Sequence, residues 1–399
     1  MVCVMSDDLL LLIACYLALL VDRVSFSRSH RRFATLLRPM IAGAKERPAA
    51  AAAALGCSHL KECVSLGRFR QAPRVVIHEA PVAETLKFNK VLTSLSLRFN
   101  RIKQDGATAI GNALACNAVL TELKLVYNRL DLKGTKAIAS ALKVNIVLTK
   151  FQICGPMSGS GDVDEGVLAI TEALKVNKVL SELHFKSYAI GDPSLGTFSA
   201  IFIGDLLKVN KCITKLRLVA CGIACAGATA VAEALKVNSV LTELYLYGNN
   251  IANKGASSIA DALMVNKVLT VLALDANEIG GKGAAAIAEG LKVNSTLISL
   301  NLDCNKIQRS GKAFRQALET NSSLKVLEMF SCDLSHTDIR RLSCGMALNM
   351  SVTALDLSYN GRYRAIWISL ILQCPSLRQA CPALLPTVSS VEAESVILY

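Results

Sequence analysis

The chain of 399 residues repeats itself every 28 residues, and this period constrains its fold more than any other feature. Asn100 and Asn128 lie 28 residues apart, and the same interval separates Asn249, Asn277 and Asn305. The unit reads Leu-x-x-Leu-x-Leu-x-x-Asn-x-Ile, then a glycine, then a helix-like stretch that ends in Leu-Lys-Val-Asn. Several copies of one unit predict a stack with a single continuous core.

Each part of the unit has a physical reason. Leu244 and Leu246 are two residues apart, so they point to the same side of a short strand. The asparagine side chain both donates and accepts hydrogen bonds, so stacked copies are expected to form a ladder with neighbouring backbones. The glycine, such as Gly255, is expected where the backbone approaches a neighbour closely or needs an unusual dihedral angle.

The second half of the unit is typical of a buried helix. Its small and aliphatic residues recur at i, i+1, i+4 and i+5, as in Ala109, Ile110, Ala113 and Leu114. The terminal lysine favours the negative end of the helix dipole, and the asparagine that follows is expected to adopt a left-handed cap.

Packed helices need about 8–10 Å each, whereas parallel strands need about 4.8 Å. A stack of such units must therefore curve with its strands inside. We predict an α/β leucine-rich-repeat solenoid, a horseshoe with a concave parallel sheet and convex helices. The composition agrees, because 52% of the residues are hydrophobic but only 5% are aromatic, which suits thin aliphatic layers.

With asparagine or cysteine at the ladder position, the unit resembles the ribonuclease-inhibitor-like leucine-rich repeats. The link Ala-Leu-Lys-Val-Asn is similar to the repeat domains of NOD-like receptors. This resemblance covers roughly Val91 to Asn360 and implies a protein-binding scaffold. No G-x-x-x-x-G-K-[ST] motif occurs in the chain, so the nucleotide-driven signalling of those receptors is not implied.

Three regions are expected. Residues 1–56 form an N-terminal extension, residues 57–375 form the solenoid with its caps, and residues 376–399 form a tail. The first repeat is expected to begin with a helix near Glu79 to Asn89, and a capping helix is expected at Arg364 to Gln373.

The extension contains the uncharged, largely apolar run Leu9 to Val21, which is shorter than the roughly 20 residues of a membrane-spanning helix. Three interpretations remain open: a targeting segment, a membrane or partner-binding anchor, and a disordered extension. The 14 cysteines include no C-x-x-C pair, which favours a reduced, cytoplasmic protein. Membrane association or organelle targeting through the extension is the alternative.

Two repeats are longer than the rest. Asn145 and Asn177 lie 32 residues apart, and Asn177 and Asn210 lie 33 apart. The extra residues are expected between strand and helix, near residues 154–166 and 187–200, with Pro156 and Tyr188 at the ladder positions. Such insertions gather on one rim of a solenoid, which is often a binding rim, although drift in a tolerant loop is the alternative. The acidic residues of the first insertion lack the spacing of an EF-hand and indicate a solvated loop.

Strand residues that alternate with the buried leucines should form the partner-binding surface. Along the chain this surface changes from basic to acidic, with two tyrosines between, and such a pattern would orient a partner. The alternative is that exposed positions vary freely and the gradient is chance. The expected partner-binding residues are Arg98, Lys124, Lys186, Arg217, Glu243, Tyr245, Tyr247, Asp275, Asp303 and Glu328.

No catalytic residues, metal site or cofactor are expected, because the five histidines are scattered and no ligand spacing fits zinc. The net charge of +13 does not indicate a nucleic-acid partner, since aromatic interleaving and RNA- or DNA-binding motifs are missing. We therefore predict a non-enzymatic scaffold for an unidentified protein partner. Two alternatives stay open: a GTPase activator, because Ran-activating proteins have similar repeats, and a receptor tethered to a membrane through Leu9 to Val21.

Overall fold

The computed structural model describes residues 64–65, 79–100, 102–154, 160–186, 196–361 and 397–398. The chain divides into unit 1, Met1–Phe151, and unit 2, Gln152–Tyr399, and each is described by itself. Outside the described residues lie Pro156, Tyr188, the expected extension with Leu9 to Val21, the expected capping helix and nearly all of the tail. Within the described ranges, no helix combines the length and the hydropathy needed to span a bilayer.

Unit 1 alternates short strands with helices. The two-residue strand β1 (Val64–Ser65) pairs in parallel with β2 (Ser94–Ser96), and β2 pairs in parallel with β3 (Glu122–Lys124), so that Leu95 lies beside Leu123. Its helices are α4 (Glu79–Phe88), α5 (Gln104–Cys116) and α6 (Leu132–Val144), and its strands are β1 (Val64–Ser65), β2 (Ser94–Ser96) and β3 (Glu122–Lys124). The helix expected near Glu79 to Asn89 is confirmed. Strand β4 (Lys150–Cys154) contains the boundary between the units.

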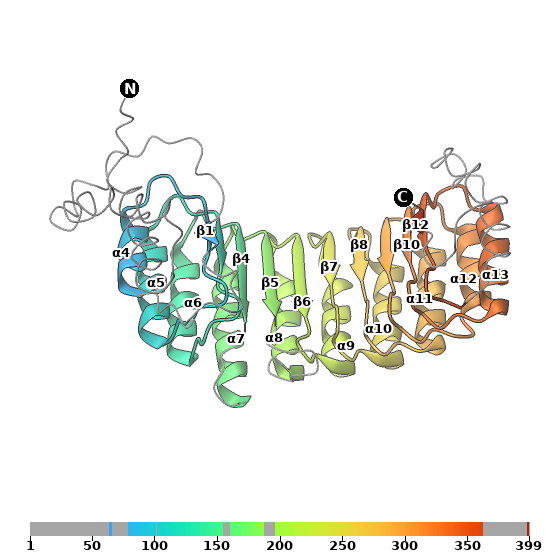
Figure 1. Ribbon diagram of the computed structural model, residues 1–399, viewed down its shortest axis with the longest axis horizontal. Coiled ribbons are helices and arrows are strands. Elements are labelled where there is room, and N and C mark those ends of the chain that lie inside the picture. Colours follow the sequence, from blue (N-terminus) through green and yellow to red (C-terminus); the bar gives the residue numbers. More distant parts are fainter. Residues whose placement is uncertain are drawn as a thin grey trace, which may run out of the picture. The chain divides into compact units, whose positions relative to one another are not determined.

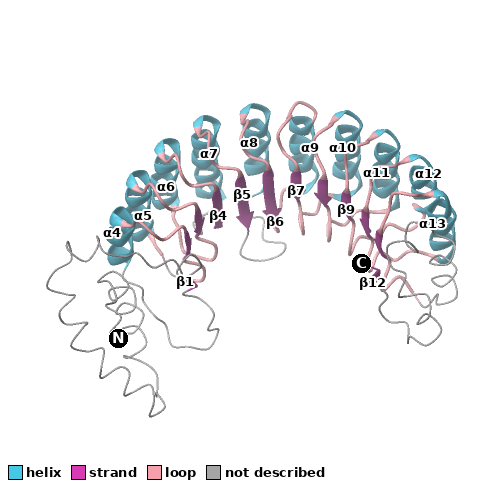
Figure 2. Ribbon diagram, turned by 90° about the horizontal axis from the view of Figure 1, so that it is seen from above, coloured by secondary structure: helices cyan, strands magenta, loops and turns pink. Residues whose placement is uncertain are grey.

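Unit 2 continues the same alternation, and its strands lie side by side in chain order (Figure 1). Strands β5 to β11 are all parallel, and β12 adds in the antiparallel direction. The strands are β5 (Glu182–Lys186), β6 (Lys215–Val219), β7 (Glu243–Tyr245), β8 (Val271–Ala273), β9 (Ser299–Asn301), β10 (Val326–Glu328), β11 (Ala354–Asp356) and β12 (Ile397–Leu398). The helices are α7 (Ser160–Val176), α8 (Gly196–Val209), α9 (Ala224–Leu235), α10 (Ala252–Val265), α11 (Gly281–Val293), α12 (Gly311–Thr320) and α13 (His336–Leu348). Within unit 2 the helices lie on the outer side of the curved stack and the strands on the inner side (Figure 2).

The core lies between the strands and the helices and is built from the leucines of the repeat. Leu123 in unit 1 and Leu244, Leu246 and Leu272 in unit 2 are completely buried. Burial of a leucine side chain contributes about 1.5–3 kcal/mol, so every repeat adds a similar apolar layer. The predicted alternation and the α/β leucine-rich-repeat solenoid are confirmed.

The helices bury most of the predicted stripe but not all of it. In α5, Ile110, Ala113 and Leu114 are buried, whereas Ala109 is half-buried and Ala107 takes its place in the core. Ala107 is buried in place of Ala109 because residues three apart lie on the same face of a helix, and Ala107 is three residues before Ile110. The glycines serve close packing: a Cβ on Gly283 would lie 3.0 Å from Ala256 Cβ in the preceding helix.

The asparagine ladder after the strands is confirmed. Asn277 Nδ2 donates to the Leu246 carbonyl oxygen of the preceding repeat at 2.8 Å. Where cysteine fills the position, its sulfur replaces the amide, and Cys332 Sγ lies 3.1 Å from the Leu302 oxygen. The ladder satisfies backbone groups that would otherwise be buried without partners.

A second asparagine ladder runs along the ends of the helices. Asn266 Nδ2 donates to the Leu235 and Asn238 oxygens of the previous repeat, and its Oδ1 accepts from the backbone of Val268 and Leu269. The left-handed cap expected at this residue is wrong, because Asn266 has φ −67° and ψ 131°, which is extended backbone. The side-chain amide of Asn266 forms hydrogen bonds to the previous repeat, and the sequence pattern of one helix does not show these bonds.

The first insertion is partly helical rather than a loop. Helix α7 has 17 residues and begins at Ser160, whereas α6 and α11 have 13 each. Asp164 Oδ1 accepts a hydrogen bond from Ser199 Oγ at 2.7 Å, which joins α7 to α8. The prediction of a solvated loop near residues 154–166 is therefore wrong for residues 160–166, which are helical. In the second insertion, residues 187–195 lie outside the described residues.

Candidate functional site

The strand face of unit 2 consists of the side chains that alternate with the buried leucines of β5 to β11. The parallel register places equivalent residues beside one another, so that Lys215 pairs with Glu243 and Arg217 with Tyr245. Further along the row of Arg217 and Tyr245, Asn301 pairs with Glu328, and Glu328 with Asp356. Because neighbouring strands lie about 4.8 Å apart, side chains in one row contact each other directly.

Lys215, Arg217, Glu243 and Tyr245 form a compact group, which we call the tyrosine cluster. The Arg217 guanidinium lies over the Tyr245 ring, 4.4 Å from its centroid, and Lys215 Nζ lies 5.5 Å from the same centroid. Tyr245 Oη donates to Glu243 Oε2 at 2.7 Å. Lys215 Nζ pairs with the same carboxylate at 2.5 Å, so the tyrosine is held at both its ring and its hydroxyl.

The electrostatics of the cluster follow from these contacts. Burial acts to raise the pKa of Glu243, but the hydrogen bonds from Lys215 and Tyr245 outweigh it and leave the pKa below its ordinary value. Burial and the neighbouring Glu243 carboxylate raise the pKa of Tyr245. The pair is therefore a carboxylate and a neutral phenol at neutral pH. Arg217 Nε is shielded from solvent and has no hydrogen-bond partner among the described residues.

Tyr247 and Lys186 flank this cluster along the same face. Tyr247 follows the buried Leu246 and is half-buried, so its ring lies on the strand face rather than in the core. Lys186 ends β5 beside Val219 of β6 and is also half-buried. The two tyrosines thus share the face with three basic side chains.

The later strands of unit 2 carry an acidic cluster, formed by Asp275, Asp303 and Glu328 with Asn301 between them. Asn301 Nδ2 donates to Asp303 Oδ2 at 3.0 Å and to Glu328 Oε2 at 2.7 Å, which bridges two of the carboxylates. Asp303 Oδ1 also accepts from the backbone N–H of Phe330 at 2.7 Å. The cluster is a constrained array of acceptors rather than a set of freely moving surface acids.

Burial raises the pKa of all three carboxyl groups. For Asp303, burial together with the charges of Glu328 and Asp356 raises the pKa to about 6. The charge of this cluster therefore changes between pH 5 and 7, a range in which an ordinary aspartate stays ionised.

An aromatic pair borders the acidic cluster. The Phe330 and Tyr359 rings lie 4.8 Å apart in a tilted arrangement, and Tyr359 is 65% exposed. Tyr359 has φ 58°, a left-handed conformation that costs about 1–2 kcal/mol for a residue with a Cβ. Other repeats place Ala220, Gly248 or Ala276 at this position before the ladder residue.

Unit 1 has its own strand face, on which the two predicted residues lie. Lys124 Nζ pairs with Glu122 of the same strand at 2.8 Å. Arg98 is half-buried just after β2. Phe99 and Tyr127 stack with ring centroids 4.4 Å apart, and both have positive φ values.

The structure thus brings Arg217, Glu243 and Tyr245 into direct contact and groups Asp275, Asp303 and Glu328. The sequence analysis missed the aromatic pairs and the bridging Asn301. A signal was present for Phe99, Tyr127 and Tyr359, because an aromatic residue directly before the ladder asparagine departs from the small residues that most repeats have there.

No catalytic or metal-binding arrangement was predicted from the sequence. In the part of the chain that the structure describes, no group of three or more histidine, cysteine, aspartate or glutamate side chains could hold a metal ion. Cys154 is buried, and His184 lies half-buried in β5 beside Arg217.

One short parallel strand and one helix per repeat, joined through ladders of asparagine, define the leucine-rich-repeat class of solenoid. Four segments of the chain match the family model of the leucine-rich repeat, residues 88–111, 237–260, 265–288 and 293–311. The chain therefore has the fold of a leucine-rich-repeat solenoid, and these four segments are similar to the leucine-rich-repeat family.

Two solved structures are similar to part of the chain. Actin-binding site 2 of leiomodin-1 is 24% identical, with a TM-score of 0.33, and the match covers 40% of this chain and 95% of that one. The C-terminal domain of tropomodulin from Caenorhabditis elegans is 13% identical, with a TM-score of 0.31, over 39% of this chain and 95% of that one. No curated protein matches the chain significantly.

Proposed function

We propose that this chain is a non-enzymatic scaffold that binds a folded protein partner on the strand face of its repeats. The observation that carries the proposal is the position of Tyr245, which lies on the strand face and is fixed by Arg217 and Glu243. Tyrosine and arginine are among the residues that are enriched in binding hot spots. A side chain that is already ordered loses little conformational entropy on binding.

Two chemically different regions of unit 2 would orient such a partner. The tyrosine cluster and the flanking Tyr247 present Arg217 and Lys215 beside two aromatic rings, and this region suits an acidic or aromatic segment. The acidic cluster suits a basic segment, since Asp303 and Glu328 are held in place by Asn301. Complementary charge at both regions fixes the direction in which a partner lies and raises its association rate.

The remaining predicted residues are proposals on the same grounds. Arg98 and Lys124 would contact a partner from the strand face of unit 1. We also propose that the repeats are of the ribonuclease-inhibitor-like type and that the protein acts in the cytoplasm. Cys221 and Cys332 support a reducing compartment, because each uses a free thiol as a ladder residue.

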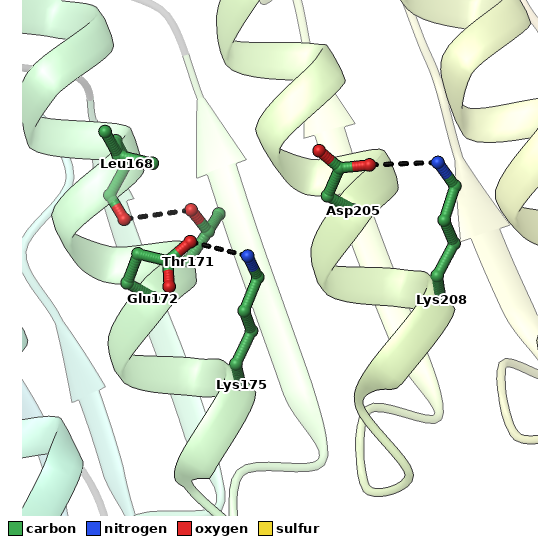
Figure 3. A network of polar contacts seen from close by, with 6 residues as sticks. All are labelled: Leu168, Thr171, Glu172, Lys175, Asp205 and Lys208. Atoms are coloured by element: carbon green, nitrogen blue, oxygen red, sulfur yellow. Dashed lines mark hydrogen bonds and ion pairs between the residues drawn. The ribbon is translucent and has the colours of Figure 1, made fainter.

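An affinity pull-down with the full chain tests the proposal. The variant Tyr245→Ala/Tyr247→Ala removes both rings from the strand face without touching the core. The matched control, Asp205→Ala/Lys208→Ala, removes an exposed ion pair from the outer surface of α8 (Figure 3). We expect partners recovered by the wild type to be lost from the tyrosine variant and retained by the control. Equal recovery by all three proteins overturns the proposal.

A further inference from the structure

A row of exposed apolar residues follows one edge of unit 2, at the ends of its helices. Each member directly precedes a buried asparagine of the second ladder. The members are 52–60% exposed, although valine is an apolar residue. We call this row the valine edge, and it consists of Val176, Val209, Val237, Val265 and Val293.

The asparagine ladder shows that these valines are neighbours in space. Asn210 Nδ2 donates to the Leu174 oxygen at 2.7 Å, and Asn238 Nδ2 donates to the Leu207 oxygen at 2.7 Å. Residues in the same position of adjacent repeats therefore lie side by side. Because packed helices are about 8–10 Å apart, the valines form a line with roughly that spacing.

Neither helix propensity nor the core explains valine at this position. Valine is a weaker helix former than alanine, leucine or lysine, any of which an exposed helix end would accommodate. Copying of one ancestral repeat is not sufficient either, because the position two residues later has changed. It is Lys178 in one repeat and Ser239 or Ser295 in others, while these repeats all keep the valine.

The lysines near this edge are of two kinds. Lys175 and Lys208 extend back along their helices and pair with Glu172 and Asp205, one turn earlier (Figure 3). The second kind follows the ladder asparagine, is exposed, and has no ion-pair partner among the described residues. These free cations are Lys178, Lys211 and Lys267.

We propose that the valine edge docks the protein on an anionic lipid surface. Lysine ammonium groups would lie at the lipid phosphates, and the valines would enter between the headgroups. The spacing favours lipid over a protein partner, because protein interfaces need a contiguous, closely packed centre, whereas headgroups accept separate side chains. This surface uses none of the strand-face residues, so the proposal of lipid binding is independent of the proposed function.

Co-sedimentation of the full chain with vesicles tests the inference. One set of vesicles contains phosphatidylcholine and phosphatidylserine, and the other contains phosphatidylcholine alone. We expect binding to the first set only. Lys211→Glu/Lys267→Glu should lower the partition coefficient by about tenfold or more for each lysine reversed. Val209→Thr/Val265→Thr keeps the side-chain shape and should lower it by roughly fivefold for each valine.

The control variant is Lys254→Glu/Lys282→Glu, which makes the same change of charge at the opposite, N-terminal ends of α10 and α11. It should bind vesicles much more tightly than the edge variant. Equal loss in both lysine variants would show an effect of net charge only and would overturn the inference. Equal binding of the wild type to both vesicle sets would do the same, and so would loss of a protein partner from the valine variant with vesicle binding unchanged.

Discussion

Asn305 and Asn277 are joined across a repeat boundary, since Asn305 Oδ1 accepts a hydrogen bond from the backbone N–H of Asn277 at 3.0 Å. Asn277 in turn accepts from the backbone N–H of Asn249 at 2.8 Å. Each side chain therefore satisfies the backbone of one repeat while its own backbone is satisfied by the next. This chain of bonds couples neighbouring repeats, in addition to the strand pairing and the apolar contacts that they share.

Removal of one ladder side chain should destabilise the protein strongly. In Asn277→Ala, the Asn249 N–H loses its partner inside the core, and the Leu246 carbonyl oxygen keeps only the bond from Asn249 Nδ2. A buried polar group left without a partner costs about 1–3 kcal/mol, so we expect a loss of about 1–3 kcal/mol in the free energy of unfolding. Urea denaturation followed by circular dichroism measures it.

Asn277→Cys is the matched control for this prediction. Cys221 and Cys332 occupy the same position elsewhere and contact a backbone carbonyl oxygen through their sulfur. The cysteine variant should therefore lose less stability than the alanine variant. Equal losses would contradict the role assigned to the side-chain hydrogen bonds.

Two adjacent glycines at the start of α11 should differ sharply in their tolerance of alanine. A Cβ on Gly281 would clash with the Gln308 carbonyl oxygen of the next repeat. A Cβ on Gly280 would lie 3.1 Å from the end of the Asn253 side chain, a milder contact than one with the backbone. We expect Gly281→Ala to cost about 1–3 kcal/mol or more and Gly280→Ala well below that. Thermal unfolding of the two variants distinguishes them, and similar melting temperatures would disprove the close approach.

The sequence predicted the features that recur at the same position of every repeat and depend on residues within that repeat. Leu244, Leu246 and the ladder position of Asn277 are of this kind, because alternation and a shared spacing specify them locally. The backbone conformation predicted for Asn266 was wrong because its partners, the Leu235 and Asn238 oxygens, belong to the previous repeat. Interactions between repeats determine the backbone conformation at this residue, and the sequence pattern of a single helix does not show them.

Asp338 should make stability depend on pH. Its carboxylate accepts hydrogen bonds from the backbone of Arg309 and Gly311 in the preceding repeat and from Ser335. Burial acts to raise the pKa of Asp338, but these bonds outweigh it and hold the pKa below its ordinary value. A lowered pKa in the folded state stabilises above the unfolded pKa of about 4, and this stabilisation is lost as pH falls through the folded value.

Asp338→Ala should therefore cost about 2 kcal/mol at pH 7, and the difference from the wild type should shrink below about pH 4. Asp333→Ala, at a nearby exposed acid, serves as the control. Free energies of unfolding measured from pH 3 to pH 8 check the prediction. A difference that stays constant over this range would show that the carboxylate charge does not matter.

Ionisation of Asp303 should destabilise the folded protein, whereas ionisation of Asp338 stabilises it. Its pKa is raised to about 6 in the folded protein, mainly by burial, so ionisation of this group opposes folding. The cost is absent below the unfolded pKa of about 4 and is complete above about pH 6. Asp303→Asn keeps an acceptor for the Phe330 N–H and should stabilise the protein by about 1 kcal/mol at pH 8, after allowance for screening by solvent. The gain should vanish at pH 4, and stabilisation that is equal at both values would refute the assignment.

The candidate site could be predicted as a surface but not as a set of contacts. Alternation along a strand places Arg217 and Tyr245 on the strand face. Their contact depends on the register between β6 and β7, which pairs the two residues directly. Asn301 was missed because its role is to join Asp303 to Glu328 of the neighbouring strand, and such a bridge has no signature in either strand alone.

Photocrosslinking tests the central claim most directly, namely that a protein partner lies on the strand face of unit 2. A photoreactive phenylalanine derivative is placed at Tyr247 in one protein and, as control, at Asp261 on the exposed surface of α10 in another. The account predicts that a captured partner becomes covalently attached through position 247 and not through position 261. Attachment through position 261 without attachment through 247 would contradict it.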